Sequence, residues 1–78
     1  MKGRAMKHCT VGDILTDEEI ERAKELYRQY RGTGQFVSKV CAELIEPNMA
    51  RINKNLGQEN DAKYLAYAVE YALSQSGV

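Results

Sequence analysis

The sequence has few of the residues that usually reveal a chemical function. It contains two cysteines, one histidine and no tryptophan. Two cysteines cannot form the dense disulfide framework of a small secreted domain, and His8 beside Cys9 lacks the second ligand pair that a zinc site requires. We therefore expect no metal, no cofactor and reduced thiols, with Cys41 in the core.

An excess of charge and a long apolar run are also lacking. Eleven Lys plus Arg balance eleven Asp plus Glu, so no strong overall field attracts nucleic acid or an anionic membrane. The longest apolar run covers six residues, 64–69, far below the roughly 20 that cross a bilayer. The first residues are polar and basic, without the apolar stretch of a secretory signal. We therefore expect a cytoplasmic protein with no membrane segment.

Seventy-eight residues are enough for one small core and leave no room for a second lobe. A composition of 44% hydrophobic and 28% charged residues is typical of a globular chain that folds. Residues 1–12 show little periodicity. We therefore expect a flexible N-terminal arm over 1–12 and a single helical domain over 13–78.

The strongest local signal surrounds Thr16. Its hydroxyl can accept a hydrogen bond from the Glu19 amide while the Glu19 carboxylate accepts one from the Thr16 amide, which is the pattern of a capping box. Leu15 and Ile20 occupy the hydrophobic staple positions on either side. The pattern predicts a helix over 16–31. Its buried face is expected to comprise Ile20, Ala23, Leu26, Tyr27 and Tyr30.

Two further helices are predicted on either side of the one proline. Apolar residues recur with helical spacing over 35–46. Pro47 must break or kink the chain, because proline cannot donate a backbone hydrogen bond to the preceding turn. Asn48 can cap a short helix over 48–56, which Gly57 closes.

The last predicted helix, over 60–75 with Asn60 as its cap, has two apolar faces. Aliphatic residues lie on one side, whereas Tyr64, Tyr67 and Tyr71 follow a separate stripe nearly opposite. Such a helix is either central and packed on both sides, with the phenol oxygens reaching water, or it presents one side to another chain.

The predicted fold is an all-α bundle of about four helices. No stretch alternates with period two for long enough to form a strand. Two longer outer helices, a short middle helix and the two-faced C-terminal helix make up the bundle. The expected core residues include Leu44, Ile52, Leu65 and Val69.

The segment 41–56 resembles the helix-turn-helix unit of DNA-binding proteins. Ala42 is the small residue that lets two helices approach, Ile45 and Ile52 hold inward positions, and Asn48 caps the helix that corresponds to the recognition helix. The sequence departs from the pattern at 46–47, where Glu and Pro replace the usual turn glycine and the apolar residue after it. The resemblance, over 42–56, implies a DNA-contact set of Arg51, Asn53, Lys54 and Asn55, with Lys39 from the preceding helix.

A polar loop of Gln58, Glu59 and Asn60 joins the last two predicted helices. Capping and turn chemistry explain such residues without any ligand. A polar loop between packed helices can also anchor a partner peptide or a small anion. Both interpretations stay open from the sequence.

No group of residues predicts catalysis. His8 lies in the predicted arm, neither cysteine has a neighbouring base, and the acids at 17–19 are typical of a helix start. We therefore expect a small non-enzymatic adaptor or regulatory protein that binds another protein or itself through Tyr64, Tyr67 and Tyr71. A helix-turn-helix-like DNA-binding regulator is the alternative. The third hypothesis is a subunit of an enzyme whose site lies between chains.

Overall fold

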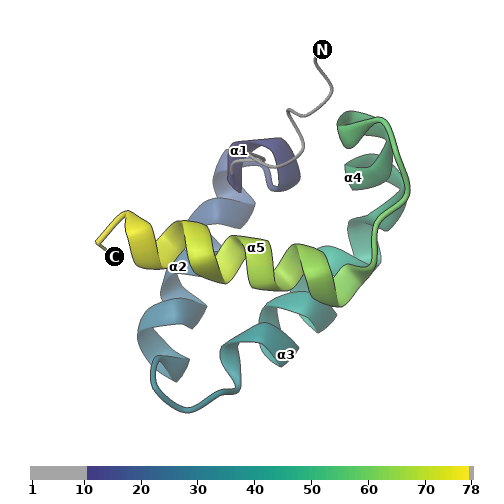
Figure 1. The fold of residues 1–78 in the computed structure, drawn as a ribbon. Coiled ribbons are helices and arrows are strands. Elements are labelled where there is room, and N and C mark those ends of the chain that lie inside the picture. The colour runs from purple at the N-terminus through teal and green to yellow at the C-terminus, as the bar shows by residue number, and fades with distance from the viewer. Residues whose placement is uncertain (1–10, 78) are drawn as a thin grey trace.

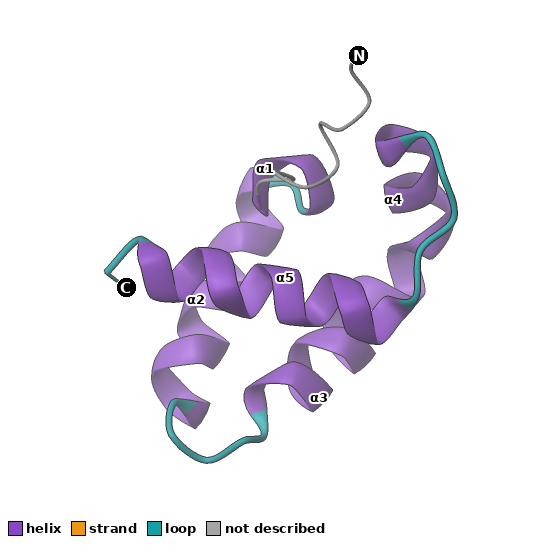
Figure 2. Ribbon diagram, in the orientation of Figure 1, coloured by secondary structure: helices purple, strands orange, loops and turns teal. Residues whose placement is uncertain are grey.

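The computed structural model describes residues 11–77, and this part of the chain contains helices and turns without any strand. In chain order the elements are α1 (Val11–Ile14), α2 (Asp17–Tyr30), α3 (Phe36–Val40), a π-helical turn (Cys41–Ile45), a 3₁₀ turn (Glu46–Asn48), α4 (Met49–Leu56) and α5 (Ala62–Gln75). Figure 2 shows how few of the described residues lie outside helices. The predicted all-α bundle is confirmed.

Helix α5 lies across the rest of the bundle. In Figure 1 it crosses α2 and α3, and it contacts α1, α2, α3 and the π-helical turn. Its inner face joins a single continuous hydrophobic core that contains no buried polar side chain among the described residues. The predicted core residues Leu44, Ile52, Leu65 and Val69 are all buried, with exposed fractions of 7%, 0%, 1% and 0%.

The capping box forms as predicted and fixes the start of α2. The Thr16 hydroxyl accepts the Glu19 amide at 3.2 Å, and the Glu19 carboxylate accepts the Thr16 amide at 3.0 Å. Leu15 is buried and Ile20 packs against the core. The helix therefore begins where its local chemistry satisfies two backbone amides that would otherwise lack partners.

The predicted break or kink at Pro47 is confirmed: α3 and α4 are separate α-helices on either side of it, joined by two irregular helical turns and not by a loop. Between α3 and α4 the backbone widens into the π-helical turn and then tightens into the 3₁₀ turn. The Glu46 amide bonds the Cys41 carbonyl five residues back. The wider turn lies directly before the turn that contains Pro47, whose ring does not fit a regular α-helix because it clashes with the carbonyl four residues before it. Figure 1 shows α4 leaving α3 at an angle.

Two residues of the presumed helix-turn-helix unit have different roles from those expected. Asn48 makes no side-chain cap for α4. Its amide nitrogen instead donates to the Leu44 carbonyl at 2.8 Å, in the turn that precedes Pro47. Ala42 is exposed and does not lie between two helices. Ile45 and Ile52 are fully buried as predicted.

The ends of the described region also refine the predicted boundaries. The predicted arm lies outside the described residues except for its last two positions, and these are helical because α1 begins at Val11, which packs against the core. At the other end the cap position of α5 is Asp61, one residue after the predicted Asn60. Gly57 closes α4 as predicted, with a positive φ of 77° that favours glycine.

Candidate protein-binding face of α5

Helix α5 buries one side completely and leaves the other to solvent. Leu65, Ala66, Val69 and Leu73 are at most 1% exposed. On the outer side Tyr64, Tyr67 and Tyr71 expose 55%, 54% and 68% of their surface, and they are the exposed large hydrophobic residues of the described chain. The alternative in which α5 packs on both sides is therefore wrong for the described chain. We call Tyr64, Tyr67 and Tyr71 the tyrosine face.

The other two tyrosines of the chain, Tyr27 and Tyr30, have ring contacts with other side chains of the fold. The Tyr27 ring meets Phe36 edge to face, with centroids 5.4 Å apart and planes at 88°. The Tyr30 ring lies under the Lys39 ammonium, 5.4 Å from its centroid. Within residues 11–77 the tyrosine face has no hydrogen bond or ring contact of this kind to its side chains. The internal packing of the described residues therefore makes no use of these three rings.

Two charged residues flank the tyrosine face on the same helix. Lys63 is exposed and Glu70 is partly exposed. Seven residues separate them, which is about 10 Å along a helix axis, too far for a salt bridge within one chain. Neither forms an ion pair with another described residue. Within residues 11–77 the face thus carries one cation and one anion that form no ion pair.

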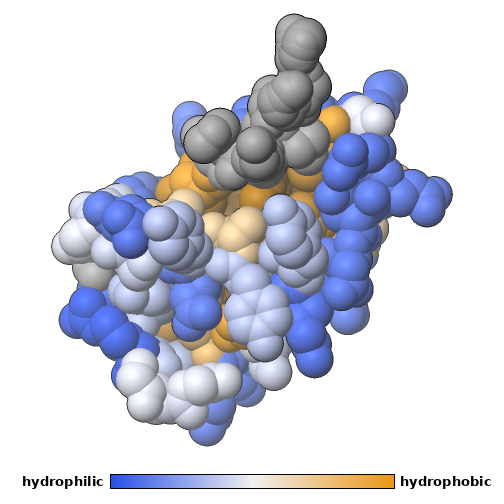
Figure 3. All heavy atoms as spheres, viewed as in Figure 1, coloured by the Kyte–Doolittle hydropathy of each residue, from blue (hydrophilic) through white to orange (hydrophobic). Residues whose placement is uncertain are grey.

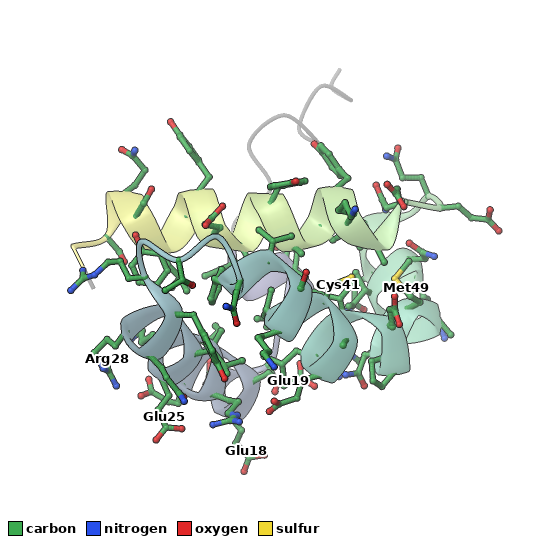
Figure 4. All side chains as sticks on the ribbon, turned by 90° about the horizontal axis from the view of Figure 1, so that it is seen from below. Glu18, Glu19, Glu25, Arg28, Cys41 and Met49 are labelled. Atoms are coloured by element: carbon green, nitrogen blue, oxygen red, sulfur yellow. The ribbon has the colours of Figure 1, made fainter. Side chains whose placement is uncertain are left out.

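The tyrosine face lies on the outside of the molecule. In Figure 3 the side chains over α5 are weakly polar, with apolar patches between them and strongly hydrophilic side chains around the rim. In Figure 4 α5 runs along one edge, its outer side chains project away from the bundle, and Cys41 lies on its inner side. The surface over α5 is thus less polar than its rim, a contrast that also occurs at protein-binding surfaces.

Arg51, the first residue of the implied DNA-contact set, is partly exposed and is held by hydrogen bonds to other parts of the chain. Its guanidinium donates to both Glu19 carboxylate oxygens, at 2.6 and 3.1 Å, and to the Ile14 carbonyl at 3.3 Å. The hydrogen bond from Arg51 lowers the pKa of the Glu19 carboxyl and raises the pKa of Arg51. Arg51 therefore connects α4 to the capping box of α2, a tie that no pattern in the sequence predicted.

The other residues of the implied DNA-contact set differ in their surroundings. Asn53 accepts both the backbone and the side-chain amide of Asn60, at 3.0 and 3.2 Å, so it holds the loop after α4. Lys54 and Asn55 are exposed on α4. Lys39 is exposed on α3, on the other side of Pro47.

The polar loop satisfies much of its own hydrogen bonding. The Gln58 side chain donates to the Asn60 side-chain oxygen at 3.2 Å, and the Asn60 side chain donates back to the Gln58 carbonyl at 3.0 Å. Glu59 is exposed. Turn chemistry accounts for the positions of Gln58 and Asn60.

Cys41 has the environment of a structural thiol. It is 9% exposed, it forms no disulfide, and its Sγ lies 3.8 Å from a Glu46 carboxylate oxygen. Burial, followed by the negative charge of Glu46, raises the pKa of the thiol. A thiol with a raised pKa is a poor nucleophile at neutral pH. The predicted pair of His8 and Cys9 lies outside the described residues.

Residues 11–77 offer neither a metal-binding cluster nor a membrane-spanning helix. No group of three or more His, Cys, Asp or Glu side chains is arranged to hold a metal ion in that range. No helix there has the length and apolar character needed to cross a membrane.

Comparison with known proteins found no family model, no curated protein and no solved structure that matches this chain. The geometry of the described residues therefore carries the functional proposal below.

Proposed function

We propose that this protein is a small, non-enzymatic helical adaptor that acts by binding a protein partner, either another protein or a second copy of itself, and that the tyrosine face of α5 is its binding surface. The observation that carries the proposal is the placement of Tyr64, Tyr67 and Tyr71 on one stripe, each more than half exposed, on a helix whose other side is fully buried. Single exposed apolar residues are common on protein surfaces, whereas a contiguous aromatic stripe is typical of an interaction site.

The residue type supports the same proposal. Tyrosine buries a large area with few rotatable bonds, and its hydroxyl can still find a partner at the edge of an interface. Internal packing uses Tyr27 and Tyr30 but leaves the tyrosine face without partners in the described chain. We place the proposed activity in the cytoplasm, which suits the free thiol of Cys41.

Photo-crosslinking in cells tests this function and captures whichever protein the face binds. A photoreactive phenylalanine derivative replaces Tyr67, and the control variant carries it at Gln29, an exposed residue of α2. We expect discrete protein adducts from position 67 and none of comparable yield from position 29. Equal yields at the two positions, or no adduct at either, would contradict the proposal.

One observation favours nucleic-acid binding as a second candidate. The stretch 26–42 contains three basic residues, Arg28, Arg31 and Lys39, and no acid. The acids on either side of it, Glu25 and Glu43, are both paired with Arg22. The α2 to α3 turn is therefore a basic end of the molecule, although Lys39 alone belongs to the contact set implied by the helix-turn-helix resemblance.

An electrophoretic mobility assay decides this second candidate. Phosphate contacts are strongest at low salt, so binding should be visible at about 50 mM salt and weaken steeply as salt rises. Changing Arg28 and Lys39 to Gln should flatten that salt dependence. An unshifted DNA band at about 50 mM salt would end the hypothesis.

A further inference from the structure

We infer that the partner of the tyrosine face is a second copy of this chain, with two α5 helices packed antiparallel about a two-fold axis. The inference rests on the proposed function and names the occupant of the same surface. The inference is based on the order of residues along α5. When a second α5 runs in the opposite direction, its tyrosines face those of the first helix and its charged residues lie beside residues of opposite charge.

The spacing of the tyrosines matches the seam of a helix pair. Tyr64, Tyr67 and Tyr71 follow one another at steps of three and four residues, which keeps them on one side of α5 over two turns. This is the spacing by which side chains of one helix pack between those of a facing helix. Ser74, three residues further on, continues the seam with a small side chain that does not obstruct it.

The charges select the antiparallel direction. When the helices run in opposite directions with the axis beside Tyr67, Lys63 of each copy lies beside Glu70 of the other. A two-fold interface uses the same patch on both subunits, so this contact occurs twice. In a parallel pair, by contrast, Lys63 faces the region of Ala68 and meets no acid. Both charges lack a partner within the described chain, and the second copy supplies one to each.

The available area limits the affinity. A buried tyrosine removes roughly 150–250 Å² from water, so the exposed portions of three tyrosines offer roughly 300–400 Å² per copy. A standard stable interface buries about 800 Å² per partner. The helix pair is therefore small, and we expect a reversible dimer with a Kd of roughly 10–100 μM.

Charge exchange across the interface tests both the partner and the direction. In sedimentation equilibrium at low salt, K63E and E70K should each dimerise about tenfold more weakly than the unchanged protein, because two attractive contacts become repulsive. An equimolar mixture of K63E with E70K should form a heterodimer of nearly the original affinity, since every contact is again between opposite charges. The double variant K63E/E70K should regain self-association for the same reason.

Two controls separate the interface from folding. Glu at position 63 suits the first turn of a helix, so K63E should retain the helix content of the unchanged protein. Glu18→Lys makes the same charge change as E70K on the surface opposite α5 (Figure 4) and should leave dimerisation unchanged. Circular dichroism checks that all variants remain folded.

The possible results distinguish failure of the inferred dimer from failure of the proposed function. A protein that stays monomeric up to about 1 mM has no second copy as its partner, and adducts from position 67 with other proteins would then leave the adaptor function standing. A dimer whose K63E and E70K variants do not prefer each other would refute the antiparallel direction. Absence of both the dimer and the adducts would overturn the proposed function with the inference.

Discussion

The ion pair between Arg51 and Glu19 leads to a stability prediction that depends on the tertiary structure. Arg51→Met keeps much of the aliphatic stem and removes four hydrogen bonds, two to the Glu19 carboxylate, one to the Ile14 carbonyl and a long one to the Asn48 side-chain oxygen. Exposed ion pairs contribute about 0.2–1 kcal/mol, whereas hydrogen bonds to charged groups contribute about 1.5–3 kcal/mol. The side chains of Glu19 and Arg51 are 18% and 36% exposed. We therefore expect Arg51→Met to lower the free energy of unfolding by about 1–2 kcal/mol.

Urea denaturation followed by circular dichroism measures this loss. In a domain of this size the loss corresponds to a decrease in Tm of roughly 4–16 °C. Glu19→Gln is the matched partner variant, because Gln can preserve the capping box with Thr16 while the ion pair is lost. A double-mutant cycle over the two changes should give a coupling free energy of about 1 kcal/mol. A coupling below about 0.3 kcal/mol would show that the tie does not stabilise the fold.

The same pair predicts how stability changes with acid. Arg51 lowers the pKa of Glu19 in the folded state, so this carboxylate stabilises the fold above its unfolded pKa of about 4.3. That contribution is lost as the pH falls from there through the lower folded pKa. The difference in unfolding free energy between the unchanged protein and Arg51→Met should therefore shrink below about pH 4. Arg28→Met, on an exposed arginine, is the control and should show no such change.

Three further changes test other parts of the structure. Leu65 is 1% exposed, so Leu65→Ala should cost about 2–5 kcal/mol in urea denaturation, and a cost below about 1 kcal/mol would contradict its place in the core. Gly57→Ala should cost about 1 kcal/mol from backbone strain alone, because an added Cβ meets no atom within 4 Å while φ stays at +77°; an unchanged Tm would refute the strain. With Cys9→Ser as background, Cys41 should react with a disulfide reagent far more slowly in the folded than in the urea-unfolded protein at pH 7.5, because burial raises its pKa; equal rates would show an accessible thiol.

Local patterns in the sequence determined the start of α2, the end of α4 and the identity of the core. The capping box around Thr16 depends on residues three positions apart, and the closure at Gly57 depends on one residue that tolerates a positive φ. Leu65 and Val69 lie on one helical stripe, so their burial follows from periodicity. Interactions between residues close in sequence can be predicted from a single sequence because few other arrangements compete with them.

The bend at Pro47 shows the limit of local signals. Pro47 predicts that a regular α-helix cannot continue, but it does not determine which irregular turns replace it or the angle between the helices on either side. Packing against the core fixes these features, because Ile45 and Ile52 are both fully buried on either side of the proline. Asn48 then bonds backward to Leu44, where the sequence alone favoured a forward cap.

For the candidate site, the sequence by itself determined that α5 carries two apolar stripes, and only the tertiary structure decided which one faces solvent. Burial of Tyr64, Tyr67 and Tyr71 depends on whether another helix covers them, and no pattern within α5 contains that information. The pairing of Arg51 with Glu19 depends in the same way on how α4 packs against α2, across 32 residues of sequence. Both are contacts between distant segments, and their partners are fixed only when the whole core has packed.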